Sequence, residues 1–290
     1  MRLQGKVAII TGASRGIGRA IALAFAQEGA DAVVVSRNLS EVEETAAKIR
    51  VLGKRALALK VDVSRREDVE VMVKSTLREF GRIDVLVNNA GILGPVGPLV
   101  ENDAELWTET VKVNLVGAFL CCKYVLPVMI SQRSGKIINL SGGGAAYPRP
   151  RFSAYASSKA AVVRLTETLA EEVKEFNIQV NAIAPGAVNT RMQEQILEVG
   201  EAAGERALSE AKKVINGKGT DPESAVKLAI FLASDESDSL TGRLISAVWD
   251  DWASLKDEIR VKEAIAKGLY TLRRIDGQFF GPKNGDIPRR

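Results

Sequence analysis

The sequence predicts a single α/β domain in which helices cover both faces of a doubly wound, parallel sheet. Three observations lead to this prediction. Short β-branched runs alternate with longer amphipathic runs, which is the order of a repeated strand–helix unit. Several strand candidates are apolar on both faces, as buried parallel strands are. No Pro-, Gly- or Ser-rich linker interrupts residues 1–247, so we expect one domain there, followed by a tail at residues 248–290.

Seven short apolar runs predict a seven-stranded sheet. These strand candidates are Val7–Thr11, Ala32–Ser36, Ala56–Val63, Asp84–Asn89, Lys136–Ser141, Ile178–Ala184 and Arg243–Val248. The amphipathic stretches between them predict helices. The helix candidates include Gly16–Glu28, Leu39–Leu52, Arg65–Phe80, Ala104–Ile130, Ala154–Phe176 and Pro222–Ala233.

Composition excludes several classes of site. The 290 residues include no histidine, which removes His triads, His general bases and His metal ligands, and we expect no metal site. Cys121 and Cys122 are adjacent and cannot close a loop, which fits a reducing cytoplasm. No apolar run approaches the ~18–20 residues of a membrane span, and the N-terminus lacks a signal-peptide pattern. We therefore expect no membrane partner.

The net charge of +4 raises the question of nucleic-acid binding. Lys and Arg residues are spread along the chain and lie near Asp and Glu, as on ordinary solvated helix faces. The basic runs Arg149–Arg151 and Arg289–Arg290 are too short for a phosphate track. We expect no nucleic-acid partner.

A glycine cluster follows the first strand and opens a helix. Gly12, Gly16 and Gly18 have the spacing Gly-x-x-x-Gly-x-Gly, wider than the usual dinucleotide fingerprint. Glycines allow a tight turn and a close approach to a pyrophosphate, which then lies at a helix N-terminus. A merely structural turn is the alternative. The position of the glycine cluster between a strand and an alanine-rich helix favours a dinucleotide site.

The end of the second strand predicts which dinucleotide binds. A site for NAD(H) has an Asp or Glu there, whereas this chain has Ser36, Arg37 and Asn38. An arginine suits a 2′-phosphate, and Arg15 in the glycine loop offers a second cation. The alternative is that Arg37 is only a surface residue. The sequence favours NADP(H) over NAD(H).

Six motifs in order resemble the short-chain dehydrogenase/reductase family over residues 3–247, most closely its 3-oxoacyl reductases. They are "TGASRGIG", "VDV", "NNAG", "VNL", "YASSK" and "PGAVNT". The resemblance implies a Rossmann-type fold and a ketone–alcohol oxidoreductase. It also implies cofactor contacts from Gly12, Ser14, Arg15, Gly16, Ile17, Gly18, Arg37, Asp62, Val63, Asn89, Ala90, Gly91, Tyr155, Lys159, Pro185, Gly186, Val188 and Thr190.

Tyr155 and Lys159 lie four residues apart, so a helix places them on one face. A nearby ammonium lowers the pKa of a tyrosine, which can then exchange a proton with a carbonyl or alcohol oxygen. The resemblance implies that Lys159 also holds the nicotinamide ribose and that Asn114 organises a water-linked proton path. A lone Tyr-x-x-x-Lys is usually an ordinary helix pair, but these motifs favour a catalytic one.

The family's carbonyl-binding serine is not at its usual place. It normally lies about thirteen residues before the tyrosine, where this chain has Gly142; Ser141 precedes it. Three interpretations follow: a local shift brings Ser141 into the site, a glycine N–H or Ser153 takes the role, or the donor is absent. Alternation along a strand points Ser141 away. The permissive glycines that follow it favour Ser141 narrowly, as the fourth catalytic residue.

The tail at residues 248–290 departs from the family, which normally ends after its seventh strand. Its aromatics are too many for a disordered end. Packing on the body or a neighbouring subunit is favoured over closure across a substrate cleft, because the family forms dimers or tetramers through its long helices and last strand. A homodimer or homotetramer is expected. The aromatics are Trp249, Trp252, Tyr270, Phe279 and Phe280.

The leading functional prediction is an NADP(H)-dependent oxidoreductase that interconverts a ketone and a secondary alcohol. Its small-molecule substrate is a 3-oxoacyl thioester, a sugar derivative or a small keto compound, and reduction is favoured by the cofactor preference. The alternative is a non-catalytic NADP(H)-binding sensor or scaffold, suggested by Gly142. The presence of Tyr155, Lys159 and Asn114 together counts against it.

Overall fold

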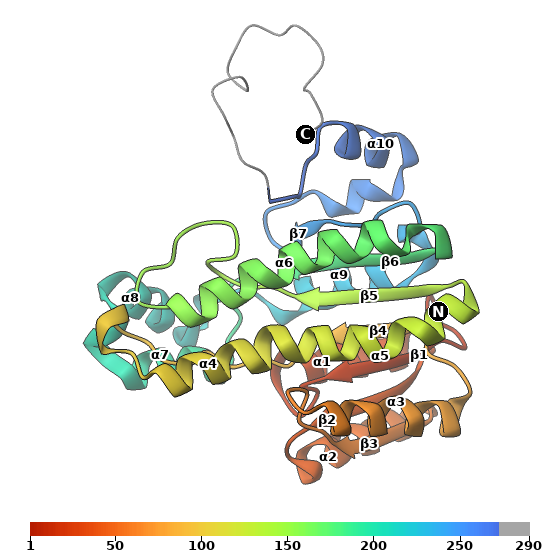
Figure 1. The fold of residues 1–290 in the computed structure, drawn as a ribbon, viewed down its shortest axis with the longest axis horizontal. Helices are drawn as coiled ribbons and strands as arrows, with labels where there is room; N and C mark the ends of the chain where they lie inside the picture. Colours follow the sequence, from red (N-terminus) through yellow and green to blue (C-terminus); the bar gives the residue numbers. More distant parts are fainter. Residues whose placement is uncertain (273–290) are drawn as a thin grey trace, which may run out of the picture.

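The computed structural model describes residues 1–272, which form one seven-stranded, wholly parallel sheet with helices around it. The strand order is β3-β2-β1-β4-β5-β6-β7 (Figure 1). This confirms the predicted doubly wound, Rossmann-type fold. The strands are β1 Val7–Thr11, β2 Asp31–Ser36, β3 Ala56–Lys60, β4 Val85–Asn88, β5 Gly135–Leu140, β6 Ile178–Ala184 and β7 Leu244–Ser246.

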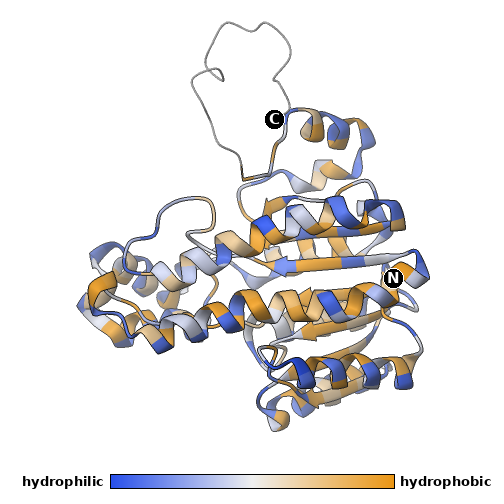
Figure 2. Cartoon of the chain, in the orientation of Figure 1, coloured by the Kyte–Doolittle hydropathy of each residue, from blue (hydrophilic) through white to orange (hydrophobic). Residues whose placement is uncertain are grey.

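Helices pack on both faces of this sheet. In Figure 2 the strands are largely hydrophobic, and the helices carry hydrophobic and hydrophilic residues together. Figure 1 shows α7 and α8 beyond the carboxyl ends of the strands. The helices are α1 Gly16–Gln27, α2 Leu39–Val51, α3 Arg66–Phe80, α4 Ala104–Val111, α5 Gly117–Gln132, α6 Ser153–Val173, α7 Arg191–Val199, α8 Glu205–Lys213, α9 Pro222–Ala233 and α10 Glu258–Ala266.

Alternate residues of the central strands enter two different cores. In β1, Ile10 joins a core with Phe25 of α1 and Phe231 of α9, whereas Ile9 joins the opposite core with Met72 of α3. All five side chains are completely buried. Each such side chain contributes roughly 1.5–3 kcal/mol on burial, which explains why the strands are apolar on both faces.

The topology fixes where a ligand can bind. β1 pairs with β2 on one side and with β4 on the other. The order in which strands are added to the sheet therefore reverses between β1 and β4. In open parallel sheets the crevice beyond the carboxyl ends at this switch point is the ligand site. The glycine loop and the segment after β4 both begin at this edge.

Two predicted strands continue two or three residues past their observed ends, and local turns explain both errors. β3 ends at Lys60 because Asp62 turns the chain: its Oδ1 accepts from the N–H and hydroxyl of Ser64, at 2.9 and 2.7 Å. β7 ends at Ser246, whose Oγ accepts from the N–H groups of Val248 and Trp249 at 3.3 and 3.1 Å. Short polar side chains favour such turns.

The long helix predicted at residues 104–130 contains a π-type turn. Lys112–Val116 separates α4 from α5 and contains Asn114. Inserted π turns are frequent at functional sites. The whole run Ala104–Gln132 is long and apolar enough to span a membrane, contrary to the expectation from composition. A single such helix is weak evidence of a membrane span, because core helices of other proteins have the same length and composition; 44% of its apolar window is buried inside the protein.

The described part of the tail packs on the body. Leu255, Val261 and Ala264 enter the core that contains α9, and the ring of Trp252 lies 5.8 Å from that of Phe231. In Figure 1, α10 lies beside β7 at the edge of the sheet. The chain then returns along β7, where the carbonyl of Tyr270 accepts from the N–H of Leu244 at 2.7 Å. Phe279 and Phe280 lie outside the described residues.

Candidate active site

The loop after β1 has a backbone that favours glycine. Gly12 and Gly16 have φ angles of +64° and +56°, in the left-handed region. A Cβ added at Gly18 would lie 2.5 Å from the carbonyl oxygen of Gly12. α1 therefore packs directly on the loop. Arg15 is the N-cap residue of α1, and no side chain among the described residues forms a capping hydrogen bond there. The first N–H groups of α1 are therefore available to an anion.

Thr11 ties this loop to the segment after β4. Its Oγ1 accepts from the N–H groups of Asn89 and Ala90, both at 3.0 Å. The side chain of Asn89 donates back to the carbonyls of Thr11 and Gly12, at 2.9 and 3.1 Å. The Asn89 side chain thus holds the glycine loop in place. These hydrogen bonds join the segments after β1 and β4 at the edge of the sheet.

The amide of Asn114 joins this edge to α6. Its Oδ1 accepts from the N–H of Ile92 at 2.8 Å, and its Nδ2 donates to the carbonyl of Ile92 at 2.9 Å and to Ser158 Oγ at 3.0 Å. Ser158 in turn donates to the carbonyl of Tyr155 at 2.8 Å. A Cβ added at Gly91 would lie 3.1 Å from Asn114 Oδ1. The π turn, the β4 segment and α6 are therefore held in one arrangement.

Tyr155 and Lys159 are both buried on the same side of α6, as their spacing predicts. Lys159 Nζ donates to the carbonyl of Leu140 at 2.8 Å and lies 5.7 Å from the centre of the Tyr155 ring. Burial lowers the pKa of Lys159 to about 8. Burial also raises the pKa of Tyr155, and Arg149 partly offsets that rise. In this structure Arg149, rather than Lys159, is the cation that lowers the pKa of the tyrosine.

Lys159→Met tests the cost of burying this ammonium. The pKa of Lys159 is lowered from 10.5 to about 8, so the unfolded chain binds more protons than the folded one between these values. The buried charge destabilises the fold below pH 8, and deprotonation relieves that cost as the pH rises. Relative to Lys159→Met, the wild-type free energy of unfolding is expected to rise by about 3 kcal/mol between pH 8 and 10.5. Urea denaturation at each pH measures the free energies of unfolding. If they change with pH in the same way for the two proteins, this prediction is wrong.

Gly142 leaves space that the hydroxyl of Tyr155 occupies. A Cβ added at this position would collide with Tyr155 Oη and lie 3.0 Å from its Cζ. A serine side chain at position 142 therefore requires Tyr155 to move. The glycine at position 142 thus allows the Tyr155 hydroxyl to lie where it does.

The two candidate replacement serines lie elsewhere. Ser141 is buried, its N–H donates to the carbonyl of Ile183 at 2.8 Å, and its Oγ has no hydrogen-bond partner among the described residues. Ser153 Oγ accepts from the indole of Trp107 at 3.1 Å and from the amide of Asn102 at 3.3 Å. Within residues 1–272, neither serine lines the cavity beside Tyr155.

Ser141→Ala separates the sequence-based preference from this geometry. Because the hydroxyl is buried without a partner in the described chain, its removal is expected to leave kcat within about threefold of wild type. An unsatisfied buried hydroxyl costs about 1–3 kcal/mol, so stability is expected to stay constant or rise. Steady-state kinetics and thermal unfolding measure both quantities. A tenfold fall in kcat would restore Ser141 as a catalytic residue.

A cavity of about 850 Å³ opens beside Tyr155 at the carboxyl ends of the strands. Its walls come from the loop after β5, the loop after β6, α7, α8 and the tail. Trp249, Tyr270, Thr271 and Leu272 are tail residues in its wall. Of the residues predicted to bind cofactor or substrate, it contains Ile17, Tyr155, Pro185, Gly186, Val188 and Thr190.

The loop after β6 faces the glycine loop. Gly186 has a φ of +82°, and Val188 forms a β-bridge with Thr220. Thr190 is the N-cap residue of α7, and its methyl group lies 3.5 Å from the point where a Cβ on Gly16 would be. Segments far apart in the sequence thus meet around the predicted nicotinamide position.

The predicted adenosine end is open and basic. Arg15 and Arg37 are both exposed, and within residues 1–272 no ion pair involves either side chain. Ser14 is buried in the glycine loop. Asp62 follows β3, and Val63 packs against α5 at Gly117. These positions are consistent with contacts to the adenosine half of a dinucleotide.

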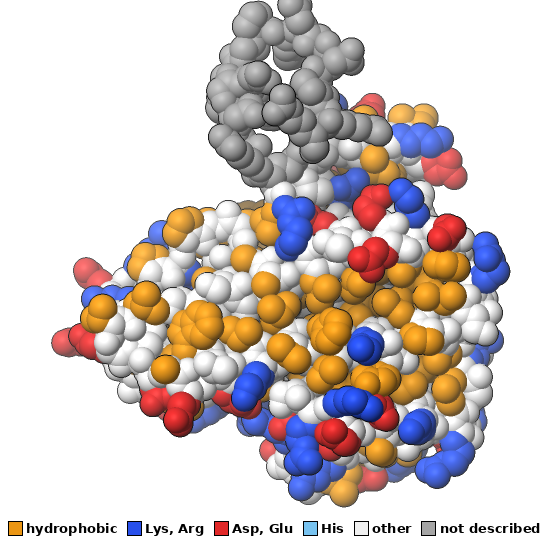
Figure 3. Space-filling model, in the orientation of Figure 1, with side chains coloured by type: hydrophobic (Ala, Val, Ile, Leu, Met, Phe, Trp, Pro, Cys, Tyr) orange, Lys and Arg blue, Asp and Glu red, His pale blue; other side chains and the backbone are white. Residues whose placement is uncertain are grey.

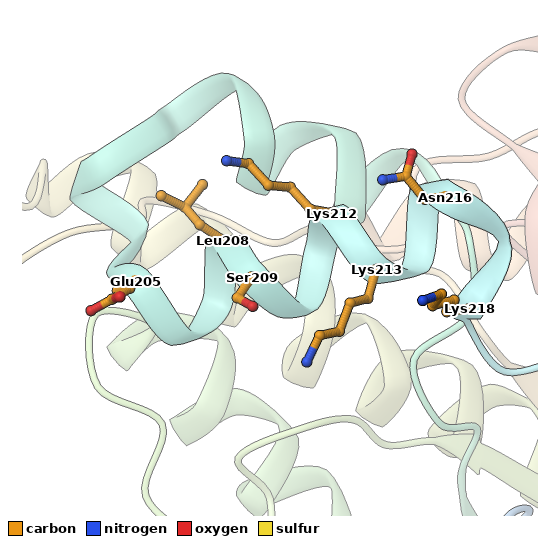
Figure 4. Close-up of a pocket in the computed structure, with 7 residues that line it drawn as sticks. All are labelled: Glu205, Leu208, Ser209, Lys212, Lys213, Asn216 and Lys218. Atoms are coloured by element: carbon orange, nitrogen blue, oxygen red, sulfur yellow. The ribbon is translucent and has the colours of Figure 1, made fainter.

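A second hollow, of about 390 Å³, lies on α8 and the turn that follows it. Figure 4 shows that the ammonium groups of Lys212 and Lys213 point away from each other. Lys218 contributes a third cation. These lysines do not converge, so we assign no site there.

Comparisons with known proteins decide the family. The family profile described as short chain dehydrogenase matches residues 6–199. The 3-oxoacyl-[acyl-carrier-protein] reductase FabG of Thermotoga maritima is 40% identical over 245 residues, covering 84% of this chain and 97% of its own. The chain belongs to the short-chain dehydrogenase/reductase family. As such it is an enzyme that acts on CH–OH and C=O groups and uses a nicotinamide cofactor.

Other relatives of this short-chain dehydrogenase/reductase agree. The oxidoreductase UcpA of Salmonella typhimurium is 39% identical over 265 residues, covering 90% of this chain and 98% of its own. The crystal structure of an NAD⁺-bound xylitol dehydrogenase superposes with a TM-score of 0.80 at 31% identity. It covers 85% of this chain and 98% of the xylitol dehydrogenase.

Three residues of this site are not identified by the sequence analysis. Thr11 was only the end of a strand, Ser158 only a spacer between Tyr155 and Lys159, and Arg149 only part of a basic run. A hydroxyl at the carboxyl end of a central strand is a usable signal for Thr11. The place of Ser158, three residues after the tyrosine, puts it on the same helix face. Nothing in the sequence predicts the position of Arg149.

Proposed function

We propose that the enzyme reduces a ketone to a secondary alcohol with NADPH, using Tyr155 as the general acid. The observation that supports this best is the buried group of Tyr155, Lys159 and Asn114, with Tyr155 in the wall of a cavity at the carboxyl ends of the strands. The 40% identity to a 3-oxoacyl-[acyl-carrier-protein] reductase supports a keto compound as the substrate.

The residues present fit a nicotinamide dinucleotide. The bare backbone at Gly12 and Gly18 and the uncapped N-terminus of α1 form a cradle that a Cβ would fill. We assign the pyrophosphate to this cradle and the 2′-phosphate to Arg37 and Arg15. The ribose beside nicotinamide is assigned to Tyr155 and Lys159, on the family resemblance.

The reaction adds a hydride and a proton across a carbonyl. NADPH held in this cradle would supply the hydride to the carbonyl carbon. Tyr155 Oη gives its proton to the carbonyl oxygen, so the C=O π bond becomes an O–H and a C–H bond. A tyrosine whose pKa is raised by burial is protonated at neutral pH, which suits a general acid. Asn114 and Lys159 serve the resupply of that proton.

The backbone after β5 is the proposed donor to the carbonyl oxygen. Gly142 and Gly143 line the cavity beside Tyr155. Among residues 1–272 no hydrogen bond engages the N–H group of either glycine. Backbone N–H groups stabilise developing oxyanions in other enzymes. This assignment replaces the serine that the family normally has at position 142.

Arg37→Glu tests the cofactor assignment. We expect kcat/KM for NADPH to exceed that for NADH at least tenfold in the wild type, or about 1.4 kcal/mol. Arg37→Glu is expected to reverse this order, because a carboxylate repels a 2′-phosphate and accepts from a 2′-hydroxyl. Lys60→Glu, an exposed change at the end of β3, is the matched control for charge. Equal values for the two cofactors, or values that Arg37→Glu does not alter, would refute the assignment.

The face formed by α4, α5 and α6 is the proposed subunit interface of a homo-oligomer. Figure 3 shows hydrophobic side chains gathered over this face. Leu106, Val116 and Phe119, on α4, the π turn and α5, are 58, 36 and 43% exposed. Contiguous apolar surface of this kind marks association sites.

A further inference from the structure

Arg149 lies inside the cavity beside Tyr155. Its guanidinium carbon is 4.0 Å from the ring centre of the buried Phe152 and 5.9 Å from that of Tyr155. Stacking on an aromatic face fixes the plane of a guanidinium and leaves its N–H edge available. The side chain is half-buried and is one of the cavity-lining residues. A positive charge is thus held next to the proposed acid.

The glycines after β5 allow this position. A Cβ added at Gly144 would lie 3.0 Å from Arg149 Cβ, and one added at Gly143 would lie 3.5 Å from Arg149 Nη1. The guanidinium therefore lies over bare backbone. The glycine run that removes the usual serine also makes room for the arginine.

Arg149 differs from the other two arginines in the cavity wall. Arg151 donates to the carbonyl of Ala202 at 3.0 Å, and Arg206 pairs with Glu210 at 3.0 Å. Within residues 1–272, by contrast, no hydrogen bond or ion pair uses the five N–H donors of Arg149.

The acidic residues of the wall make other contacts or are exposed. Glu210 is paired with Arg206, and Asp250 accepts from the N–H of Ser246 at 2.6 Å. Glu205 is exposed at the start of α8. Within residues 1–272 none of these carboxylates forms an ion pair with Arg149, although the wall as a whole carries both signs.

We propose that Arg149 binds a carboxylate on the substrate, so that the enzyme acts on oxo acids in preference to neutral ketones. The inference rests on the proposed function and names the substrate class of the same cavity. A guanidinium binds a carboxylate through two parallel hydrogen bonds, which orients as well as attracts it. The carbonyl of an oxo acid is then directed toward Tyr155 from a fixed anchor.

Binding of benzoate and benzamide to the NADPH complex tests this without requiring the natural substrate. Calorimetry on the wild-type complex is expected to give at least tenfold tighter binding of benzoate. Arg149→Gln is expected to abolish that preference, and Arg149→Lys to retain only part of it. Arg151→Gln, which changes another cavity arginine, is the matched control and is expected to keep it. Equal affinities in the wild type, or a preference that survives Arg149→Gln, overturn the proposal.

Turnover of benzoylformate and its methyl ester separates this inference from the proposed function. The acid is expected to have at least a tenfold higher kcat/KM, lost in Arg149→Gln through KM more than kcat. Equal losses for acid and ester would mean that Arg149 serves the chemistry generally, and would overturn the carboxylate assignment. If benzoate preference holds but no carbonyl compound oxidises NADPH, the proposed function fails and the anion site stands. If Arg149→Gln does not fold, the wild-type comparison of benzoate with benzamide still decides.

Discussion

Tyr155→Phe is expected to lower kcat by about 10²–10⁴-fold while leaving the affinity for NADPH within a few-fold of wild type. The hydroxyl is the only group lost, and it lies in the space beside Gly142 at the cavity wall. Phenylalanine fills the same buried volume, so the fold is expected to persist. Stopped-flow turnover and nucleotide fluorescence measure the two quantities separately.

Tyr147→Phe is the matched control for this substitution. Tyr147 lines the same cavity but is 59% exposed, and it carries no role in the proposed reaction. Its loss is expected to leave kcat within about threefold. A Tyr155→Phe enzyme with kcat similar to that of Tyr147→Phe would remove Tyr155 from the mechanism.

Gly18→Ala is expected to raise the Kd for NADPH at least tenfold and to destabilise the fold by about 1–3 kcal/mol. Helix propensity alone predicts the opposite sign, since Ala stabilises a helix by up to about 1 kcal/mol relative to Gly. The steric effect is larger because the added methyl group meets the Gly12 carbonyl at 2.5 Å and also the amide of Asn89. The glycine loop must move, and its cradle is lost.

Gly81→Ala is the control for a glycine without such neighbours. An added Cβ at Gly81 meets no atom within 4 Å among the described residues, although its φ of +75° strains any side chain. It is expected to lower stability by about 1 kcal/mol and to leave NADPH binding unchanged. Thermal unfolding and calorimetry compare the two variants. If Gly18→Ala binds NADPH as well as Gly81→Ala does, the glycine loop is not the pyrophosphate site.

The fold was predictable because local patterns and the tertiary structure agree. β1, β6 and α9 have the bounds that the sequence predicts. The errors lie where side-chain hydrogen bonds, rather than apolar periodicity, determine the end of a strand. Asp62 and Ser246 are examples, because their hydrogen bonds end β3 and β7 early. The π turn around Asn114 was invisible for the same reason, since apolar periodicity continues through it.

The sequence predicts which residues form the proposed catalytic group, but it does not predict how their pKa values shift. Spacing placed Tyr155 and Lys159 on one helix face, which the structure shows. The sequence-based expectation that Lys159 lowers the pKa of Tyr155 is not met here, because burial dominates both groups and Arg149 is the cation that opposes the rise. Burial and through-space neighbours are properties of the packed chain, which sequence spacing does not encode.

The region after β5 was the hardest to predict. The spacing from Tyr155 identifies Gly142 as the position where the family normally has a serine. The choice among Ser141, Ser153 and a glycine N–H depends on which of these groups points toward Tyr155, and spacing does not give that. Only the folded structure shows that the Tyr155 hydroxyl lies where a serine side chain at position 142 would be. Likewise, the basic run that argued weakly for a phosphate track places Arg149 in the substrate cavity.

Deuterium transfer from NADPH labelled at both C4 positions tests the central claim most directly. With a panel of oxo acids and neutral ketones, mass spectrometry is expected to find one deuterium on the carbinol carbon of the product alcohol. The signal is expected to fall to background with Tyr155→Phe and to persist with Tyr147→Phe. Tight NADPH binding without deuterium in any product, or equal transfer by Tyr155→Phe, would contradict hydride transfer governed by Tyr155.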